Sequence, residues 1–192
     1  MIIKICGVQN IETLLCCEKN DANFFGMIFY EKSPRNISIE KAIKLQQESM
    51  KMKINGVGVF VDNKIEDLKK YIRILDLKYV QLHGNEDNIM INEIKELNVK
   101  VIKKISIKNK NDIKSIKNFD GADYFLFDYK PRENELPGGN SKSFDWNIIN
   151  NLKLEKPWFL SGGINISNIQ FIKSKIKPYG IDLSSGVEIK LG

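Results

Sequence analysis

The 192-residue sequence is poor in metal-binding residues, with one histidine, His83, and three cysteines. It has no Cys-x-x-Cys pair, so a zinc site or a two-histidine centre lacks ligands, and we expect no metal. Cys16 and Cys17 are adjacent in the sequence, and a normal disulfide could hardly join them. The cysteines therefore predict free thiols in a reducing compartment.

Long apolar runs are also missing, since no stretch approaches the roughly 18 residues that a membrane span needs. The N-terminus is interrupted by Lys4 and is too short for a signal peptide, so we expect a cytoplasmic protein without a membrane partner. No Pro/Gly/Ser-rich spacer divides the chain. A single domain over residues 1–192 is the simplest organisation.

The formal net charge of +6 raises the question of a nucleic-acid partner. The lysines are scattered with matching acids, and the run from Lys103 and Lys104 to Lys117 has no interleaved aromatic residues. We expect these lysines to form a solvated surface and expect no nucleic-acid partner. A small anionic substrate is compatible with the charge.

Short apolar runs alternate along the chain with segments of helical pattern. The predicted strands are Ile2–Ile5, Phe24–Phe29, Val57–Val61, Tyr79–Leu82, Val99–Ile102, Tyr124–Phe127, Trp158–Leu160 and Gly180–Leu183. The predicted helices are Asn10–Glu18, one that starts at Ser38, Lys64–Leu75, Glu86–Leu97, Lys110–Lys117, Asp145–Leu152 and Ser167–Lys175. Eight strands alternating with helices favour a closed (β/α)₈ barrel, with an open doubly wound sheet as the alternative.

A barrel of this kind carries its chemistry at the C-terminal ends of its strands. The residues at these ends are Cys6, Tyr30 to Arg35, Asp62, His83, Asp128, Ser161 to Gly163 and Ser184 to Gly186. Cys6 could act as a base or nucleophile, or be a buried structural cysteine. Asp128 could donate a proton or cap a loop, Arg35 could bind a carboxylate or form a rim salt bridge, and His83 could act in acid–base chemistry or be structural.

Two strand ends near the C-terminus bear glycines, at Gly162-Gly163 and at Ser184-Ser185-Gly186. Small residues after an apolar strand let backbone N–H groups point at an oxyanion, and a helix that opens after the first pair would add its positive end. Each end alone also fits an ordinary tight turn. Together they predict a phosphate-binding seat.

The motifs at these positions, taken in order from residue 4 to residue 188, resemble the phosphoribosylanthranilate isomerase family of tryptophan biosynthesis. They are Lys4-Ile5-Cys6-Gly7, Ser33-Pro34-Arg35, Val57-Gly58-Val59-Phe60-Val61, Gln81-Leu82-His83-Gly84, Phe127-Asp128, Phe144-Asp145-Trp146, Ser161-Gly162-Gly163-Ile164 and Asp182-Leu183-Ser184-Ser185-Gly186-Val187-Glu188. The resemblance implies a single (β/α)₈ barrel without a cofactor that isomerises N-(5-phosphoribosyl)anthranilate to the 1-deoxyribulose 5-phosphate derivative by an Amadori rearrangement.

The resemblance also implies roles for individual residues. Cys6 matches the family's general base and Asp128 its general acid. Arg35 is expected to meet the anthranilate carboxylate. The remaining substrate-binding residues that we assign are His83, Gly162, Gly163, Asp182, Ser184, Ser185 and Gly186. The partner is then a small phosphorylated molecule, and the protein is a monomer or a homodimer.

Two departures from the family pattern stand out. The loop from Gly138 to Ser143 differs from the usual Gly-Gly-Thr-Gly sequence, and the chain given ends at Gly192, where family members continue into an eighth helix. We therefore expect a barrel without its last helix, which would leave an apolar flank of the first and last strands exposed. Either the sequence is truncated, or this flank is covered another way, such as by a partner subunit. Alternative functions are another phosphate-binding barrel enzyme, such as indole-glycerol-phosphate synthase or a sugar-phosphate epimerase, and a non-catalytic phosphate- or nucleic-acid-binding barrel.

Overall fold

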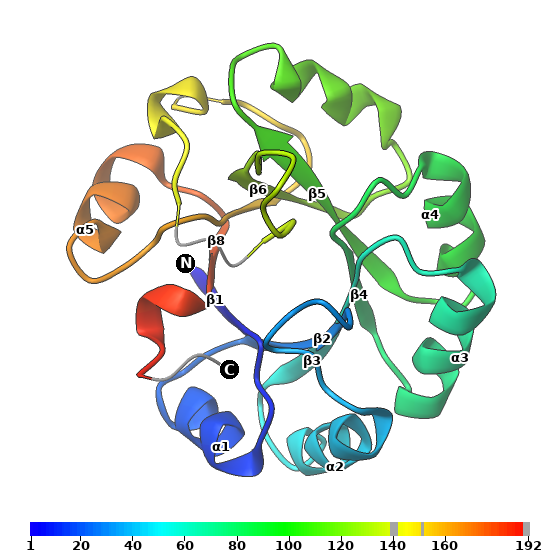
Figure 1. Ribbon diagram of the computed structural model, residues 1–192. Coiled ribbons are helices and arrows are strands. Elements are labelled where there is room, and N and C mark those ends of the chain that lie inside the picture. Colours follow the sequence, from blue (N-terminus) through cyan, green and yellow to red (C-terminus); the bar gives the residue numbers. More distant parts are fainter. Residues whose placement is uncertain (139–141, 151, 190–192) are drawn as a thin grey trace.

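Eight parallel strands close into a barrel in a computed structural model that describes residues 1–138, 142–150 and 152–189 (Figure 1). The strands are β1 (Ile2–Cys6), β2 (Phe24–Phe29), β3 (Asn55–Phe60), β4 (Tyr79–Leu82), β5 (Lys100–Ile107), β6 (Tyr124–Tyr129), β7 (Trp158–Leu160) and β8 (Gly180–Leu183). Each strand pairs with the next, and β8 pairs with β1 with Ile2 opposite Gly180. The predicted closed barrel is confirmed, and the open sheet is wrong.

Four well-formed α-helices cover the first half of the barrel (Figure 1). They are α1 (Ile11–Lys19), α2 (Ile39–Ser49), α3 (Ile65–Leu75) and α4 (Asn88–Lys95). The side chains of Asn10, Ser38 and Asp87 accept hydrogen bonds from the backbone N–H groups three residues on, and thereby cap α1, α2 and α4. The predicted helix start at Ser38 is confirmed.

The second half of the barrel has shorter helical segments than the sequence predicts. Lys110–Lys117 forms the 3₁₀-helix Asp112–Asn118, which has three residues per turn and so turns Ile113 and Ile116 to one face against the core. Among the described residues of Asp145–Leu152, which leave out residue 151, the one helical segment is the 3₁₀ turn Trp146–Ile148, where asparagine, a weak helix former, occupies the centre. The predicted helix over residues 167–175 is α5 (Ile169–Phe171), continued by a π-helical turn, Ile172–Ile176.

Strand β5 is longer than predicted and continues from Ile102 through Lys103 and Lys104 to Ile107. The two lysines do not end the strand because both find partners while buried. Lys103 donates to Glu86 at 2.7 Å, and Lys104 donates to the backbone oxygen of Pro137 at 3.0 Å. The expectation that these lysines belong to a solvated surface is wrong for Lys103, Lys104 and also Lys4, all of which are buried.

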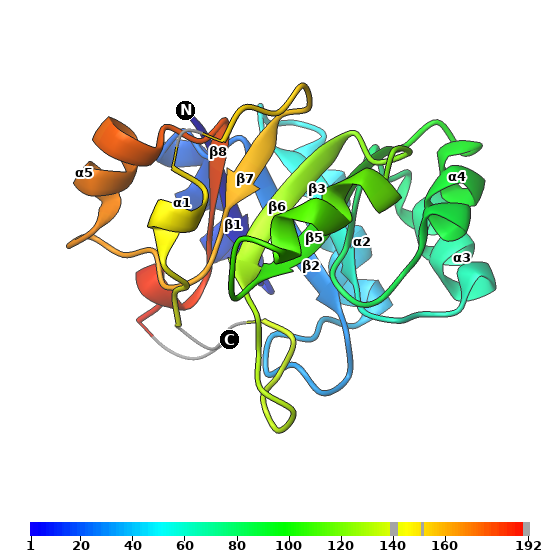
Figure 2. The ribbon, with the colours of Figure 1, turned by 90° about the horizontal axis from the view of Figure 1, so that it is seen from above.

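The hydrophobic core has two parts. The larger lies between the strands and the surrounding helices, and the smaller fills the barrel interior. The interior residues that form the smaller cluster are Cys6, Phe24, Val57, Val59, Ile102, Leu126 and Phe159. At the C-terminal ends of the strands the interior becomes polar, and the loops that follow β2 and β6 project from this same end (Figure 2).

After β8 the chain forms a 3₁₀ turn, Ser185–Val187, and residues 190–192 lie outside the described residues. On the outer face of the last strand Ile181 is buried, and Ile3 and Ile5 on the first strand are partly buried. The expected uncovered face of these strands is therefore only partly open. In the described part of the chain, no helix is long and apolar enough to cross a membrane.

Candidate active site

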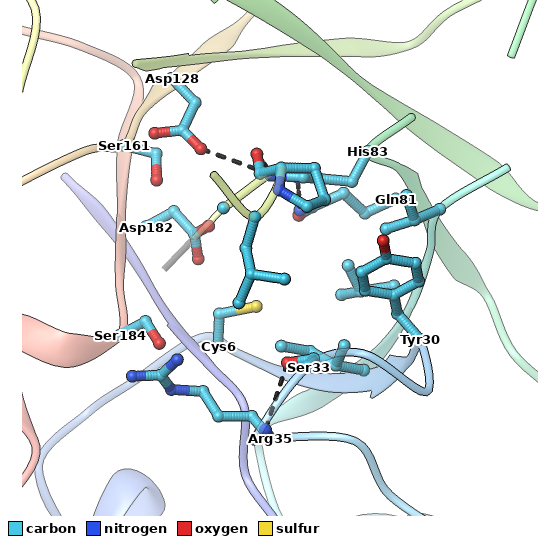
Figure 3. Close-up of a pocket in the computed structure, with 16 residues that line it drawn as sticks. Cys6, Tyr30, Ser33, Arg35, Gln81, His83, Asp128, Ser161, Asp182 and Ser184 are labelled. Atoms are coloured by element: carbon cyan, nitrogen blue, oxygen red, sulfur yellow. Dashed lines mark hydrogen bonds and ion pairs between the residues drawn. The ribbon is translucent and has the colours of Figure 1, made fainter. Parts of the chain in front are cut away.

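A pocket with about 570 Å³ of empty space opens at the C-terminal end of the barrel (Figure 3). Side chains from several strand ends and the following loops surround it, including Cys6, Arg35, His83 and Asp128. These residues are separated by up to 122 positions in the sequence, yet the barrel directs them into one space. Of the strand-end residues, Asp62 does not line this pocket; its carboxylate accepts the backbone N–H of Asn85 at 2.6 Å.

Cys6 ends β1 with its side chain inside the barrel and lines the pocket. Burial disfavours the charged thiolate and raises the pKa of Cys6 to about 11, although the nearby Lys4 ammonium lowers it. Cys16 is exposed and Cys17 is buried on α1, away from the pocket-lining residues. Only one of the three thiols therefore faces the cavity.

Asp128 lies near the end of β6 with its carboxylate at the rim of the cavity. Its Oδ1 accepts the backbone N–H of Tyr129 at 2.8 Å, and its Oδ2 lies 3.4 Å from Nε2 of His83. Asp128 is buried, and its Oδ2 faces Nε2 of His83. The contacts of His83, described next, imply that this nitrogen carries a hydrogen.

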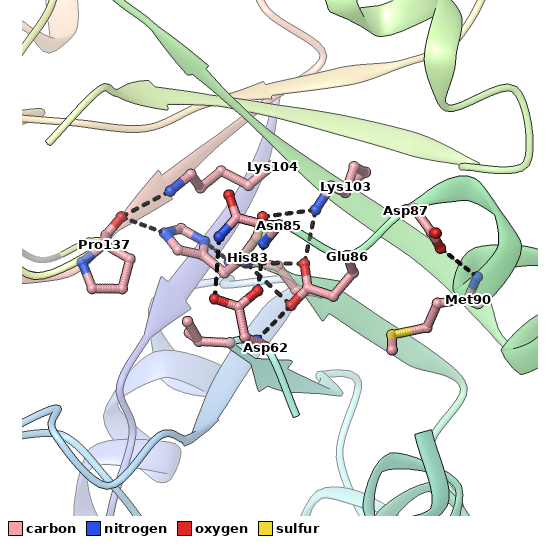
Figure 4. Close-up of polar contacts among 12 residues, drawn as sticks. Asp62, His83, Asn85, Glu86, Asp87, Met90, Lys103, Lys104 and Pro137 are labelled. Carbon is pink, nitrogen blue, oxygen red and sulfur yellow. Dashed lines mark hydrogen bonds and ion pairs between the residues drawn. The ribbon is translucent and has the colours of Figure 1, made fainter. Parts of the chain in front are cut away.

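The imidazole of His83 has partners on both ring nitrogens: Figure 3 shows Gln81 and Asp128, and Figure 4 shows Pro137. Nδ1 lies 2.8 Å from the amide nitrogen of Gln81, which can only donate, so Nδ1 is an acceptor. Nε2 faces the backbone oxygen of Pro137 at 3.2 Å and the Asp128 carboxylate, so Nε2 carries the hydrogen. Burial, together with the Lys104 ammonium, lowers the pKa of His83. The ring is therefore neutral and donates toward Asp128.

Arg35 follows β2 and is almost fully buried beside the pocket. Its Nε and Nη2 donate to the two carboxylate oxygens of Glu188 at 2.5 and 2.6 Å. Glu188 thus occupies part of the planar guanidinium group that we expected to bind a substrate carboxylate. The pairing also raises the pKa of Arg35. Since a guanidinium has five N–H donors, three remain beyond this pair.

The two glycine-bearing strand ends lie against each other. A Cβ on Gly186 would lie 1.9 Å from the backbone oxygen of Ile164, so only glycine permits this approach. Gly162 and Gly163 have φ values of +88° and +67°, which side-chain-bearing residues rarely adopt. These residues line a second pocket that continues the first and shares its lining residues Asp128, Gly138, Ser161, Asp182 and Ser184.

One part of the predicted phosphate seat is wrong. No helix opens directly after Gly163, because α5 begins only at Ile169, and so the positive end of a helix dipole does not lie at the glycines. A cation instead borders the same pocket, since Lys142 lines it while pairing with Glu135. The loop that contains Gly139, Asn140 and Ser141, where the sequence departs from the family pattern, lies in part outside the described residues.

Sequence reasoning assigned no role to several polar residues of this site. Gln81 and Lys142 line the pockets, and Lys4, Lys104 and Glu188 pair with residues that line them. For Lys4 a signal was present, because residues two apart on a strand share a face and Lys4 precedes Cys6 by two. Asp182, expected to bind substrate, lines both pockets and is paired with Lys4. Among residues 1–138, 142–150 and 152–189, no group of three His, Cys, Asp or Glu side chains is arranged to hold a metal ion.

Comparisons with known proteins agree on one family. The family model described as N-(5'phosphoribosyl)anthranilate (PRA) isomerase matches residues 3–192. The N-(5'-phosphoribosyl)anthranilate isomerase of Rhizobium etli is 40% identical over 193 residues, which cover 99% of this chain and 86% of the relative.

Solved structures of the same family share the fold. The phosphoribosyl anthranilate isomerase of Thermotoga maritima superposes with a TM-score of 0.89 at 33% identity, covering 100% of this chain and 92% of that one. A second structure, at TM-score 0.83 and 31% identity with 100% and 91% coverage, is of monomers generated from that dimeric protein. A third, at TM-score 0.84 and 31% identity with the same coverage, is a complex with reduced 1-(o-carboxyphenylamino)-1-deoxyribulose 5-phosphate.

Proposed function

Because the chain belongs to the N-(5'-phosphoribosyl)anthranilate isomerase family, we propose that its pocket converts N-(5-phosphoribosyl)anthranilate to 1-(2-carboxyphenylamino)-1-deoxyribulose 5-phosphate in tryptophan biosynthesis. The observation that carries the proposal is one cavity that holds a thiol, a carboxyl group and a cation and runs into a glycine-lined end. An elongated substrate with a phosphate at one end and an aromatic carboxylate at the other matches this layout.

Asp128 is the proposed general acid. It donates a proton to the furanose ring oxygen, the C1–O bond breaks, and the nitrogen lone pair forms the protonated Schiff base. His83, neutral and donating through Nε2, stabilises the Asp128 carboxylate once its proton has left.

Cys6 is the proposed general base. Its thiolate takes the proton from C2, and the electrons of that C–H bond form the enolamine while the Schiff base nitrogen becomes neutral. Return of a proton to C1 and loss of the enol proton at O2 complete the tautomerisation. The sequence of steps gains and loses no atom or electron overall, and so it needs no cofactor.

The substrate ends are held by the remaining residues that we assign. Arg35 meets the anthranilate carboxylate through the N–H donors that Glu188 does not use. The phosphate lies among Gly162, Gly163, Ser184, Ser185 and Gly186, at the pocket that Lys142 and Asp182 also border. The reacting carbon atoms then fall between these anchors, beside Cys6 and Asp128.

A product assay tests the proposal. The purified chain is mixed with N-(5-phosphoribosyl)anthranilate, loss of substrate fluorescence is followed, and the product is identified by NMR. We expect the ketose product to form with enzyme-limited kinetics. Turnover to indole-glycerol phosphate, or no turnover together with salt-dependent polyanion binding, would support the alternative barrel enzymes or the non-catalytic barrel instead.

We further propose that the partner is this small phosphorylated molecule and that the chain is a monomer or a homodimer, as the Thermotoga maritima relative is described as dimeric. A cytoplasmic location stays a prediction of the sequence. Sedimentation at several concentrations distinguishes the two oligomeric states.

A further inference from the structure

Lys4 is a fully buried lysine inside the barrel, beside the pocket-lining residues Cys6 and Asp182, and the proposed mechanism gives it no role. It precedes Cys6 by two residues on β1, so both side chains point into the barrel. Its side chain has no solvent exposure, and its Nζ donates to Oδ1 of Asp182 at 2.8 Å. The two residues are direct partners in the register of β1 and β8. The ammonium charge is therefore held in place by the strand pairing itself.

The Lys4 ammonium and the Cys6 thiol border the same small space. This space lies at Gly26, the partner of Cys6 in the register of β1 and β2. A Cβ on Gly26 would lie 2.8 Å from Sγ of Cys6 and 3.3 Å from Nζ of Lys4. The absence of a side chain at Gly26 thus leaves room for Sγ of Cys6 and Nζ of Lys4 beside each other inside the barrel.

The charges around Cys6 are few and can be named. Lys4 precedes it on β1, Asp182 faces it from β8, and Arg35, already paired with Glu188, lies in the loop after β2. Strand β2 presents only Gly26 at this point. A buried thiol in such surroundings strongly favours its neutral form unless a cation is close. Among these groups, Lys4 makes the largest contribution that favours the thiolate.

We propose that Lys4 is a positioning residue for the isomerase reaction, because its ammonium, anchored by Asp182, stabilises the Cys6 thiolate that accepts the proton from C2. Lys4 keeps all three of its protons throughout, while sulfur gains the substrate proton and later gives it up. The inference rests on the proposed role of Cys6 as the base. It assigns the buried Lys4–Asp182 pair to the catalytic chemistry, beyond its place in the packing of the barrel.

Alkylation of Cys6 by iodoacetamide, without substrate, tests the inference. In a Cys16→Ser/Cys17→Ser background only Cys6 reacts, and the rate of its alkylation at pH 8 reports the fraction present as thiolate. We expect Lys4→Met to lower this rate by about tenfold or more, and Lys4→Arg to restore most of it. As the matched control, Lys104→Met removes another buried barrel lysine, on β5, and leaves the rate unchanged.

Kinetics add a second readout. We expect Lys4→Met to lower kcat at neutral pH by about tenfold or more with KM within about twofold, because Arg35 and the glycines at the proposed phosphate end are untouched. Should Lys4→Met fail to fold, Lys4→Met/Asp182→Leu removes both charges without leaving one unpaired. The alkylation rate of its Cys6 is expected to fall as well, though by less, because the Asp182 carboxylate that opposes the thiolate is also gone.

The outcome that overturns the inference is an unchanged alkylation rate of Cys6 at pH 8 in a folded Lys4→Met or double variant. That result can occur in a chain that still turns over N-(5-phosphoribosyl)anthranilate, in which case the proposed function stands and the role of Lys4 does not. Absence of isomerase activity in the unmodified chain would instead remove the proposed function.

Discussion

Burial favours the neutral form of both Cys6 and His83. Because a neutral thiol is protonated and a neutral imidazole has lost a proton, burial raises the pKa of Cys6 and lowers that of His83. Burial by itself therefore favours a thiol beside a neutral imidazole, and the charged neighbours of each group act on top of it. The sequence alone could place both residues at strand ends, but their protonation depends on Lys4 and Lys104, whose burial it did not reveal.

His83 makes the stability of the protein depend on pH in a narrow window. Its pKa is lowered in the native state, so the unfolded chain, with a pKa of about 6.5, binds a proton first as the pH falls. We expect the free energy of unfolding to decrease below about pH 6.5, with a slope approaching 1.4 kcal/mol per pH unit at most.

Because His83 is the sole histidine of the chain, the effect can be assigned by difference. Urea unfolding between pH 7 and pH 5 is compared for the wild type and His83→Asn, and the variant is expected to have the flatter dependence. Equal slopes in the two proteins would show that His83 is not held neutral in the native state.

At the level of the elements, strand positions followed from the sequence better than helix lengths. Alternating apolar runs located all eight strands, but β5 was cut short at Ile102 because a lysine pair normally indicates a surface. The outward Lys103 is buried under the segment after β5, with Glu86 as its partner and the ring of Phe119 5.3 Å from Nζ. Glu86 and Phe119 lie outside β5, so the local sequence pattern around Lys103 does not predict these contacts.

The Lys103–Glu86 pair fixes the loop after β4, since Glu86 also accepts backbone N–H groups of Asp62 and Gly84 (Figure 4). We expect Lys103→Met to lower the free energy of unfolding by about 3–5 kcal/mol, because a buried carboxylate loses its cation. Urea denaturation measures the change. Lys100→Met on the same strand is the control, as Lys100 is exposed and its loss leaves the urea midpoint nearly unaltered.

A comparable loss of unfolding free energy in Lys103→Met and Lys100→Met would contradict the stabilising role of the Lys103–Glu86 pair. It would mean that the side-chain stem of either lysine, and not the buried ion pair, stabilises β5.

For the whole molecule, the alternation of strands and helices predicted the closed barrel and thus the end at which the site lies. The contacts that shape the site could not be predicted in the same way. The pairs Arg35–Glu188 and Lys4–Asp182 join residues 153 and 178 positions apart, and they exist only because β8 closes onto β1. Closure of the barrel is therefore what brings Arg35 and the Cys6 thiol to the glycine-lined end that we propose binds the phosphate.

The most direct test of the central claim is steady-state turnover of N-(5-phosphoribosyl)anthranilate by the wild type, Cys6→Ser and Asp128→Asn, with phosphate-ligand binding measured in parallel. We expect both variants to lose at least about 10²-fold in kcat while they bind a phosphorylated substrate analogue nearly as well as the wild type. Near-normal turnover by either variant would contradict the role proposed for that residue as base or acid.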